Sequence, residues 1–229
     1  MINLALEQKF YDAKSYSDSL RREELEITPA QRWVVYGTTV KEHSTSFYCG
    51  LPKTAPRLSE VVKELPEGAL VADICAGTHA LRSIQKPIRG VAIGLTDSRT
   101  REEENSDTQR GITLIGSRSV DDRTGDIFYP GTWDIFDQVT GGYVNLMIFR
   151  PAGGSIQAFR DLGEEFELEF LKFLCSKLAS GGMAYLQKYF PRKPRHSELF
   201  QEWASQINSE GFKVKYYKRR SARIYVERV

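Results

Sequence analysis

Hydrophobic and polar positions follow two different periods along the chain. Short apolar runs that end in polar, small or acidic residues predict parallel strands; they lie at residues 69–74, 90–97, 112–115, 144–149 and 183–186. Apolar residues at helical spacing predict helices between them; these lie at residues 58–65, 79–85, 132–140, 163–178 and 199–210. Thr132 is the predicted cap of its helix, and residues 99–110 are charged enough to be a solvated helix or loop.

The C-terminal residues alternate between apolar and polar positions. The alternation covers residues 212–216 and 223–226 and is interrupted by the polar stretch 218–221, which predicts a β-hairpin. The order of elements predicts an α/β fold: a Rossmann-like, doubly wound, mostly parallel sheet with helices on both faces and a C-terminal antiparallel hairpin at one edge.

Residues 1 to about 50 have helix signals without strand alternation. Thr28-Pro29 is a predicted helix start, and residues 43–50 form a polar and aromatic segment that we interpret as a loop. We therefore expect an N-terminal helical extension with a lid-like loop at 1–55, and a core domain at 56–229.

The composition is that of a globular protein in a reducing compartment. Of 229 residues, 41% are hydrophobic and 27% charged, and no apolar run approaches the roughly 20 residues that span a bilayer. Three cysteines at wide spacing do not suggest a disulfide framework. With no signal-peptide pattern at the N-terminus, we expect a cytoplasmic protein without membrane contact. The oligomeric state stays open.

Positive charge is concentrated near the C-terminus. The net charge of +2 is too small to indicate nucleic acid, but Lys188–His196 and Lys213–Arg223 are basic and contain aromatic residues. These segments could form a phosphate-binding rim that stacks RNA bases. The alternative, which we favour, is a solvated loop and an edge strand protected by lysines from aggregation.

The first apolar run leads into a turn of small residues. Asp73, Cys75, Ala76, Gly77 and Thr78 follow each other at the end of the predicted strand. Small residues let a ligand approach the backbone, and open α/β sheets bind ligands at such turns. We expect these residues to form a ligand-binding wall, although Asp73 could instead cap the next helix. Cys75 could be a nucleophile, but we favour a packing role.

No metal site is expected. The three histidines and three cysteines have no metal-ligand spacing, and Cys75 with His79 is an isolated i, i+4 pair.

Five strand and helix alternations closed by a hairpin resemble the class I methyltransferases, which bind S-adenosylmethionine. The resemblance covers about residues 58–229. In that family the first strand ends in Asp-x-Gly-x-Gly-x-Gly, which passes under the methionine part of the cofactor. Residues 73–79 read Asp-Ile-Cys-Ala-Gly-Thr-His, so the motif is degenerate: Gly77 is retained, Cys75 is still small, and His79 replaces the last glycine.

The resemblance implies roles for two further acidic residues. Asp97 follows the second strand, where the family holds the ribose hydroxyls with a carboxylate; Thr96 is a rival by strict count. Asp126, followed by Ile127, resembles the element beside the adenine. Both aspartates could instead accept local amides in turns.

The methyl-acceptor side of the resemblance departs most from the family. Arg150-Pro151 stands where the family often has Asn or Asp before Pro-Pro and an aromatic residue. This difference argues against methylation of a base amine by the family's motif. Arg150, Pro151, His43 and Tyr48 are the candidates near the acceptor, with the 43–49 loop as a lid. Arg150 either makes a structural ion pair or faces an anionic substrate.

Three functions follow as hypotheses. The resemblance implies an S-adenosylmethionine-dependent methyltransferase whose acceptor, a small molecule or RNA, is unidentified. The alternative is a non-catalytic methyltransferase-like domain that binds RNA or a protein through its basic C-terminal edge. A nicotinamide-dependent oxidoreductase is disfavoured because the required glycine spacing is absent.

Overall fold

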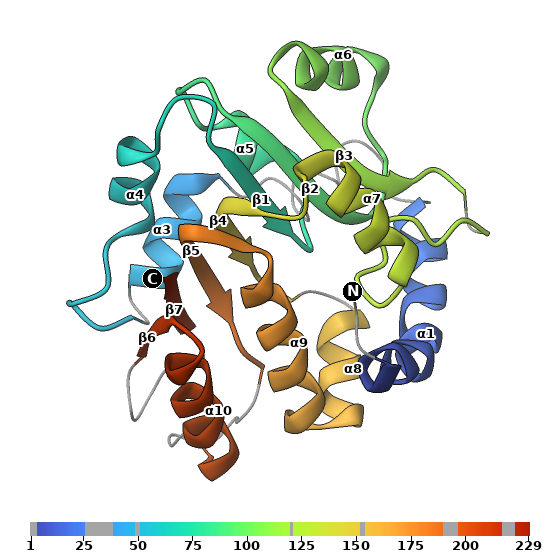
Figure 1. Ribbon diagram of the computed structural model, residues 1–229. Coiled ribbons are helices and arrows are strands. Elements are labelled where there is room, and N and C mark those ends of the chain that lie inside the picture. The colour runs from blue at the N-terminus through green and yellow to red at the C-terminus, as the bar shows by residue number, and fades with distance from the viewer. Residues whose placement is uncertain are drawn as a thin grey trace.

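The fold is a seven-stranded sheet with helices on both faces (Figure 1). The computed structural model describes residues 4–25, 39–48, 51–119, 121–151, 154–189, 197–216 and 223–229. The predicted helix start at Thr28-Pro29 and the last residues of the predicted 43–50 loop lie outside the described residues.

The strand order of the sheet is β3-β2-β1-β4-β5-β7-β6. The strands are β1 (Leu70–Ile74), β2 (Arg89–Thr96), β3 (Ile112–Ser117), β4 (Val144–Phe149), β5 (Leu178–Gln187), β6 (Phe212–Tyr216) and β7 (Arg223–Arg228). β7 pairs antiparallel with both β5 and β6, while β1 to β5 pair in parallel. The predicted fold class is confirmed. The C-terminal hairpin is also present, with its second strand inserted beside β5.

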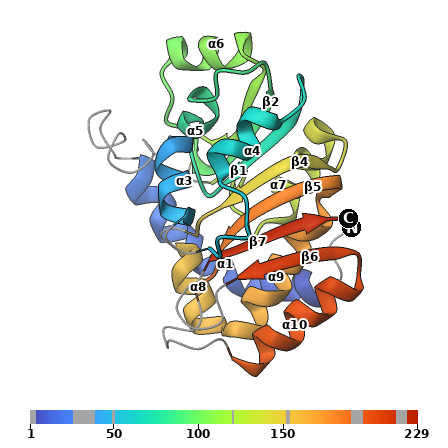
Figure 2. The same ribbon diagram turned by 90° about the vertical axis from the view of Figure 1, so that its left-hand side faces the viewer.

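Two groups of helices cover the two faces of the sheet (Figure 2). One face is covered by α3 (Val40–Tyr48), α4 (Leu58–Glu64) and α5 (His79–Arg82). The other is covered by α1 (Leu4–Leu25), α7 (Pro130–Thr140), α8 (Gly154–Leu162), α9 (Glu164–Ser176) and α10 (Glu198–Ser209). α6 (Arg101–Gln109) lies beside β3 at one end of the sheet.

β1 shows how the sheet separates the two cores. All five of its residues are buried, as expected for a central strand covered on both faces. Because side chains alternate along a strand, Leu70, Ala72 and Ile74 join the core on the α1 side, whereas Val71 joins the core under α4 and α5. Asp73 shares the face of Val71 and is thereby directed toward α3.

The larger core is a cluster of phenylalanine rings that includes α1. Phe10 of α1 lies 5.9 Å, centroid to centroid, from both Phe128 and Phe170. Phe159 and Phe166 surround the same rings at 5.6–5.7 Å. Contacts of this kind add favourable edge-to-face energy to the burial of apolar area. The division of the chain at residue 55 stays a prediction, and α1 packs into this core.

The prediction of a loop at 43–50 is wrong for residues 43–48, because residues 40–48 form α3. The helix begins with reciprocal bonds between Thr39 and Glu42: the Glu42 amide donates to Thr39 Oγ1 (3.3 Å), and Glu42 Oε2 accepts from the Thr39 amide (2.6 Å). This arrangement is a capping box, a pattern that is present in the sequence Thr-Val-Lys-Glu.

Several helix boundaries also differ from the predictions. α5 has four residues and ends at Arg82, and α8 was not predicted. α7 begins at Pro130, so Thr132 is not its cap; Thr132 Oγ1 instead accepts from the Gly125 amide at 3.0 Å. Leu199, assigned to the apolar stripe of α10, is half exposed. The long helix α9 and the strand β4 agree with the prediction.

Candidate functional site

The candidate site lies where β1 and β4 end side by side. β2 and β3 continue from β1 in one direction of the sheet, and β4 and β5 lie in the other. Such a reversal of strand order leaves a crevice at the carboxyl ends of the strands, where open α/β sheets bind ligands. Ile74 and Phe149 are register partners at this point, so the turn after β1 and the residues after β4 are neighbours.

The turn after β1 has a left-handed residue at its start. Cys75 has a φ of 65°, and among the described residues it is the one non-glycine residue with positive φ. An L residue is strained there, and glycine is favoured. Cys75 stands at the position aligned with the first glycine of the resembled motif. The Cys75 Sγ lies 4.0 Å from Ser155 Oγ at the start of α8, a neighbour that sequence reasoning missed.

The same turn leans toward β2. The Ala76 amide donates to the Ile93 carbonyl at 3.0 Å, and a Cβ on Gly94 would lie 2.8 Å from the Ala76 carbonyl oxygen. Gly94 therefore permits this close approach. Cys75, Ala76 and Gly77 are half-buried, whereas Thr78 is buried. The backbone of this turn is thus partly accessible, and its role as a ligand-binding wall stays a prediction.

Asp73, His43 and Arg150 form a row across the crevice. The His43 Nε2 atom lies 3.6 Å from Asp73 Oδ2, and His43 Nδ1 lies 3.3 Å from Arg150 Nη1. Asp73 and His43 are almost completely buried, with 1% and 4% of their surface exposed. Both carboxylate oxygens of Asp73 lack a hydrogen-bond partner among the described residues. The sequence assigns Asp73 to the cofactor and His43 and Arg150 to the acceptor side, and the structure places the three side chains next to one another.

The contacts of His43 define its tautomer. A guanidinium only donates hydrogen bonds, so Nδ1 must accept from Arg150 and the imidazole proton is on Nε2, directed at Asp73. Burial raises the pKa of Asp73, and the nearby imidazole of His43 and the charge of Arg150 oppose that rise. The row therefore has a carboxyl group at one end and a guanidinium at the other, with the imidazole ring between them.

The sequence left two roles open for Arg150, and the first of them, a structural ion pair, is not found among the residues that the structure describes. Among the residues the structure describes, no carboxylate lies within 4.0 Å of its guanidinium, and its buried Nε has no hydrogen-bond partner. Pro151, the next residue, is buried. Tyr48 belongs to α3, and its side chain lies outside what the structure describes.

Asp97 is already occupied by arginines. It follows β2 directly, and its Oδ1 accepts from the Arg99 amide and Nε, while Oδ2 accepts from Arg99 Nη2 and Arg118 Nη2. Burial opposes its ionisation, but the bonds from Arg99 prevail and lower its pKa. A carboxylate has about four acceptor positions. All four are in use, and Thr96, its rival, is buried.

Asp126 has the local contacts of a turn carboxylate. Its Oδ1 accepts from the Phe128 amide at 2.9 Å, and its Oδ2 accepts from Arg123 at 2.6 Å. The adjacent Gly125 packs against the sheet so closely that a Cβ there would lie 2.1 Å from the Gly94 carbonyl oxygen. Ile127 is buried in the aromatic core, and its carbonyl accepts from Trp133 Nε1 at 2.9 Å. The proposed ligand roles of Asp97 and Asp126 stay predictions.

His79 is the first residue of α5 and is half-buried. Burial and the charge of Arg82 lower its pKa. In the described part of the chain, no group of three or more His, Cys, Asp and Glu side chains could hold a metal ion. Cys175, one of the described cysteines, is fully buried in the core.

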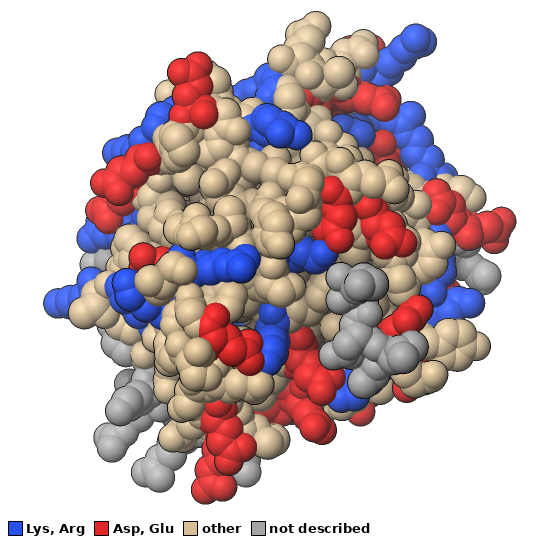
Figure 3. Space-filling model, in the orientation of Figure 1, with Lys and Arg blue, Asp and Glu red and all other residues tan. Residues whose placement is uncertain are grey.

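The two basic segments lie only partly within the described residues. Lys188 is buried, pairs with Glu164 and lies over the Phe200 ring. Tyr189 and Tyr216 pack against the aromatic core, and residues 190–196 and 217–222 lie outside the described residues. Positive and negative side chains are interspersed on the face shown in Figure 3. Among the described helices, none combines the length and apolarity needed to span a bilayer.

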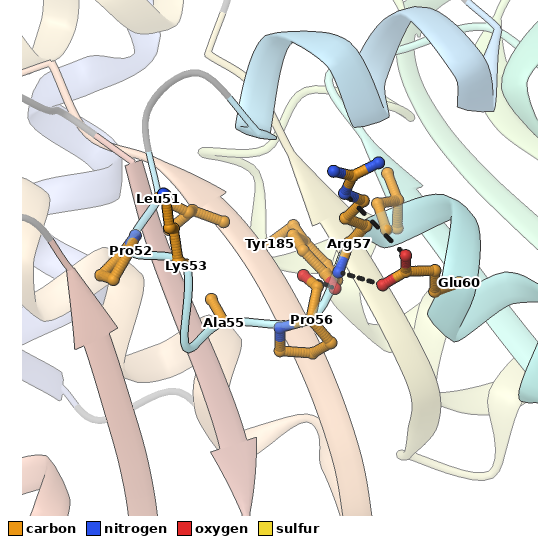
Figure 4. Close-up of a pocket in the computed structure, with 9 residues that line it drawn as sticks. Leu51, Pro52, Lys53, Ala55, Pro56, Arg57, Glu60 and Tyr185 are labelled. Atoms are coloured by element: carbon orange, nitrogen blue, oxygen red, sulfur yellow. Dashed lines mark hydrogen bonds and ion pairs between the residues drawn. The ribbon is translucent and has the colours of Figure 1, made fainter.

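A pocket of about 280 Å³ lies over β5 on the α4 face of the sheet (Figure 4). It is enclosed by residues 51–60, and Tyr185 of β5 forms its floor. The Tyr185 hydroxyl donates to the Pro56 carbonyl at 2.9 Å, which ties the segment to the sheet. Lys53 and Arg57 line the pocket from its exposed side.

Comparisons with known proteins show similarity to solved structures. No model of a known protein family matches the sequence, and no curated protein matches it. A putative rRNA methylase from Clostridium thermocellum is 14% identical over 75% of this chain and 92% of that one, with a TM-score of 0.43. A ribosomal protein L11 methylase from Lactobacillus delbrueckii subsp. bulgaricus is 13% identical over 81% and 78%, with a TM-score of 0.38.

A third similar structure contains ligands. The 1,6-didemethyltoxoflavin-N1-methyltransferase from Burkholderia thailandensis, with bound 1,6-didemethyltoxoflavin and S-adenosylhomocysteine, is 12% identical over 74% of this chain and 73% of that one. Its TM-score is 0.42. Identities and scores this low do not establish a shared activity.

Proposed function

We propose that the protein is an S-adenosylmethionine-dependent methyltransferase whose cofactor binds at the turn after β1. The observation that supports this most is the combination of Cys75 and Asp73 in that turn. Cys75, aligned with a glycine of the resembled motif, has a left-handed φ of 65°, and Asp73 directs into the same crevice a buried carboxylate that has no hydrogen-bond partner among the described residues. Strain and unsatisfied buried charge persist where function requires them.

The residues of the turn fit the cofactor's methionine end. A buried carboxylate whose two oxygens lack partners is costly unless a cationic donor reaches it, and an α-ammonium group is such a donor. The half-buried backbone of Ala76 and Gly77 lets a ligand approach. We therefore assign the ammonium to Asp73, with Cys75 and Ala76 beneath the adjoining chain.

The nucleoside end requires a rearrangement of arginines. For the ribose hydroxyls to reach Asp97, Arg118 is the group to leave, because its side chain is 54% exposed and makes a single bond to Asp97. For the adenine to reach Asp126, Arg123 would have to release Oδ2. Asp97, Asp126 and Ile127 are proposed to contact the nucleoside in that rearranged state.

Little further chemistry is required of the protein. The sulfonium of the bound cofactor supplies an activated methyl group, so positioning and exclusion of water account for most of the rate. α3 places His43 over Asp73 and excludes water from it. Both nitrogens of His43 are directed at Asp73 and Arg150, so we assign it a positioning role rather than that of general base.

The test is calorimetric titration with two ligands that differ in the amino-acid end. S-adenosylhomocysteine contains it, and methylthioadenosine lacks it. The wild type should bind S-adenosylhomocysteine at least about tenfold more tightly, because a charged hydrogen bond contributes about 1.5–3 kcal/mol. Asp73→Asn should remove most of that difference, whereas Asp134→Asn, on the exposed side of α7, should preserve it. No heat with S-adenosylmethionine or its product at millimolar concentration would refute the proposal.

One observation favours the non-catalytic alternative. The acceptor positions of Asp97 are filled by Arg99 and Arg118, which leaves no vacant carboxylate for a ribose. A domain of this kind would bind RNA or a protein instead. It is favoured if neither cofactor form binds while a single-stranded RNA oligonucleotide binds with an affinity that falls steeply with salt.

A further inference from the structure

Arg150 differs from the half-buried arginines Arg82 and Arg99 in having no anionic partner among the described residues. Arg82 pairs with Glu103 and Asp107, and Arg99 pairs with Asp97 and Asp107. Arg150 contacts a neutral imidazole nitrogen, and no carboxylate of the described residues lies within 4.0 Å of it. The cost of partly burying a guanidinium is thus not offset in the way it is for its neighbours.

The guanidinium is held in place but not saturated. His43 accepts from Nη1, and the buried Nε has no hydrogen-bond partner among the described residues. A guanidinium has five N–H donors arranged as a planar fork that matches a carboxylate or a phosphate. Donors therefore remain for an oxyanion.

Arg150 and the turn after β1 lie on opposite sides of β1 in the sheet. The turn leans toward β2, where Ala76 bonds to Ile93. Arg150 follows β4, whose last residue Phe149 is paired with Leu186 of β5. A ligand that bridges the crevice would thus present different groups to Asp73 and to Arg150.

We propose that Arg150 is an oxyanion-binding residue that holds a carboxylate or phosphate group of a molecule bound between the ends of β1 and β4. His43 is a positioning residue for Arg150, because His43 Nδ1 accepts a hydrogen bond from Nη1 and so holds one nitrogen of the guanidinium in place. Two sources have this chemistry: an anionic methyl acceptor, or the carboxylate of the cofactor's own methionine end. Oxyanion binding stands by itself, whereas the choice between these sources rests on the proposed methyltransferase function.

The first arm of the test uses inorganic phosphate and benzoate as probes, titrated in a buffer without competing anions. The wild type should bind at least one of them, and Arg150→Gln should weaken that binding at least about tenfold, as expected for charge-assisted hydrogen bonds. Arg150→Lys should recover part of it. The matched control is Arg160→Gln, an exposed arginine of α8 that pairs with Asp161 and should leave probe binding unchanged.

The second arm identifies the source. If Arg150→Gln weakens S-adenosylhomocysteine but not methylthioadenosine, the anion is the cofactor's carboxylate. If Arg150→Gln binds both nucleosides normally, but phosphate or benzoate no longer binds this variant when it is saturated with S-adenosylhomocysteine, the anion belongs to the acceptor. Probe binding that depends on Arg150 in a protein that binds no cofactor supports this proposal and refutes the methyltransferase. The proposal is overturned if Arg150→Gln binds both probes and S-adenosylhomocysteine as the wild type does, or if Arg160→Gln loses the probes equally.

Discussion

The carboxyl group of Asp73 lies beneath His43, with 3.6 Å between Asp73 Oδ2 and His43 Nε2, and neither side chain has appreciable contact with solvent. Burial raises the pKa of Asp73 above its ordinary value of 3.8. The folded protein then binds this proton more tightly than the unfolded chain does. Asp73 thus contributes stability that is fully present below pH 3.8 and is lost as the pH rises through its folded pKa.

Asp73→Asn should therefore raise the melting temperature at neutral pH even though it weakens cofactor binding. The gain should shrink as the pH falls toward 3.8, where the wild-type carboxyl is protonated in both states. Thermal unfolding of both proteins between pH 4 and pH 8 measures this. Asp134→Asn, at an exposed position, should change stability by less than about 0.5 kcal/mol at every pH. A variant less stable than the wild type at pH 8 would contradict the assignment of a costly buried charge.

The central strands of the sheet could be predicted from the sequence because they are buried on both faces. Val144 to Phe149 is an apolar run of strand length with no competing helical spacing, and β4 has those bounds. α3 was missed although its capping box between Thr39 and Glu42 is legible, because the polar residues after it suggested a loop. α8 was not predicted, although it has an apolar stripe that includes Phe159.

The candidate site could be predicted residue by residue but not as an arrangement. Position after a strand identified Asp73, Asp97 and Arg150. Local sequence does not reveal which carboxylates an arginine from another segment will occupy, and Arg118 is distant in the chain from Asp97. Lys188 shows the same limit, since a lysine in a basic run proved to be buried beside Glu164.

The left-handed conformation of Cys75 predicts an inverted order of stability for two small substitutions. Glycine ordinarily costs about 0.5–1 kcal/mol relative to alanine. At a φ of 65°, an L residue instead costs about 1–2 kcal/mol. Cys75→Gly should therefore unfold at a higher temperature than Cys75→Ala, by about 2–4 °C for a chain of this length. Thermal unfolding of the two variants measures this difference in unfolding temperature. An alanine variant as stable as the glycine variant would show that the turn adopts another conformation in solution.

Gly125 should be far less tolerant than Gly141, although both have positive φ. Alanine at Gly141 (φ 72°) meets nothing within 4 Å and should cost only the conformational strain, about 1–2 kcal/mol. Alanine at Gly125 (φ 93°) would also approach the Gly94 carbonyl oxygen to 2.1 Å. Backbone displacement there should add about 1–3 kcal/mol. Urea unfolding of the two variants tests this comparison, and equal losses would mean that the 125 loop does not rest on β2.

The cluster around Lys188 gives a last prediction, which concerns the order of three substitutions. Lys188 is buried, bonds to Glu164 and is attracted by Glu167, which is fully buried. Lys188→Met leaves two carboxylates without their cation and should cost about 3–5 kcal/mol. Glu164→Gln leaves the ammonium with Glu167 still beside it, so the loss should be smaller, about 2 kcal/mol. Lys172→Met, which breaks the exposed pair with Glu210, should cost under about 1 kcal/mol. Chemical unfolding at pH 7 measures all three, and a Glu164→Gln loss larger than that of Lys188→Met would show that Glu167 does not share the lysine.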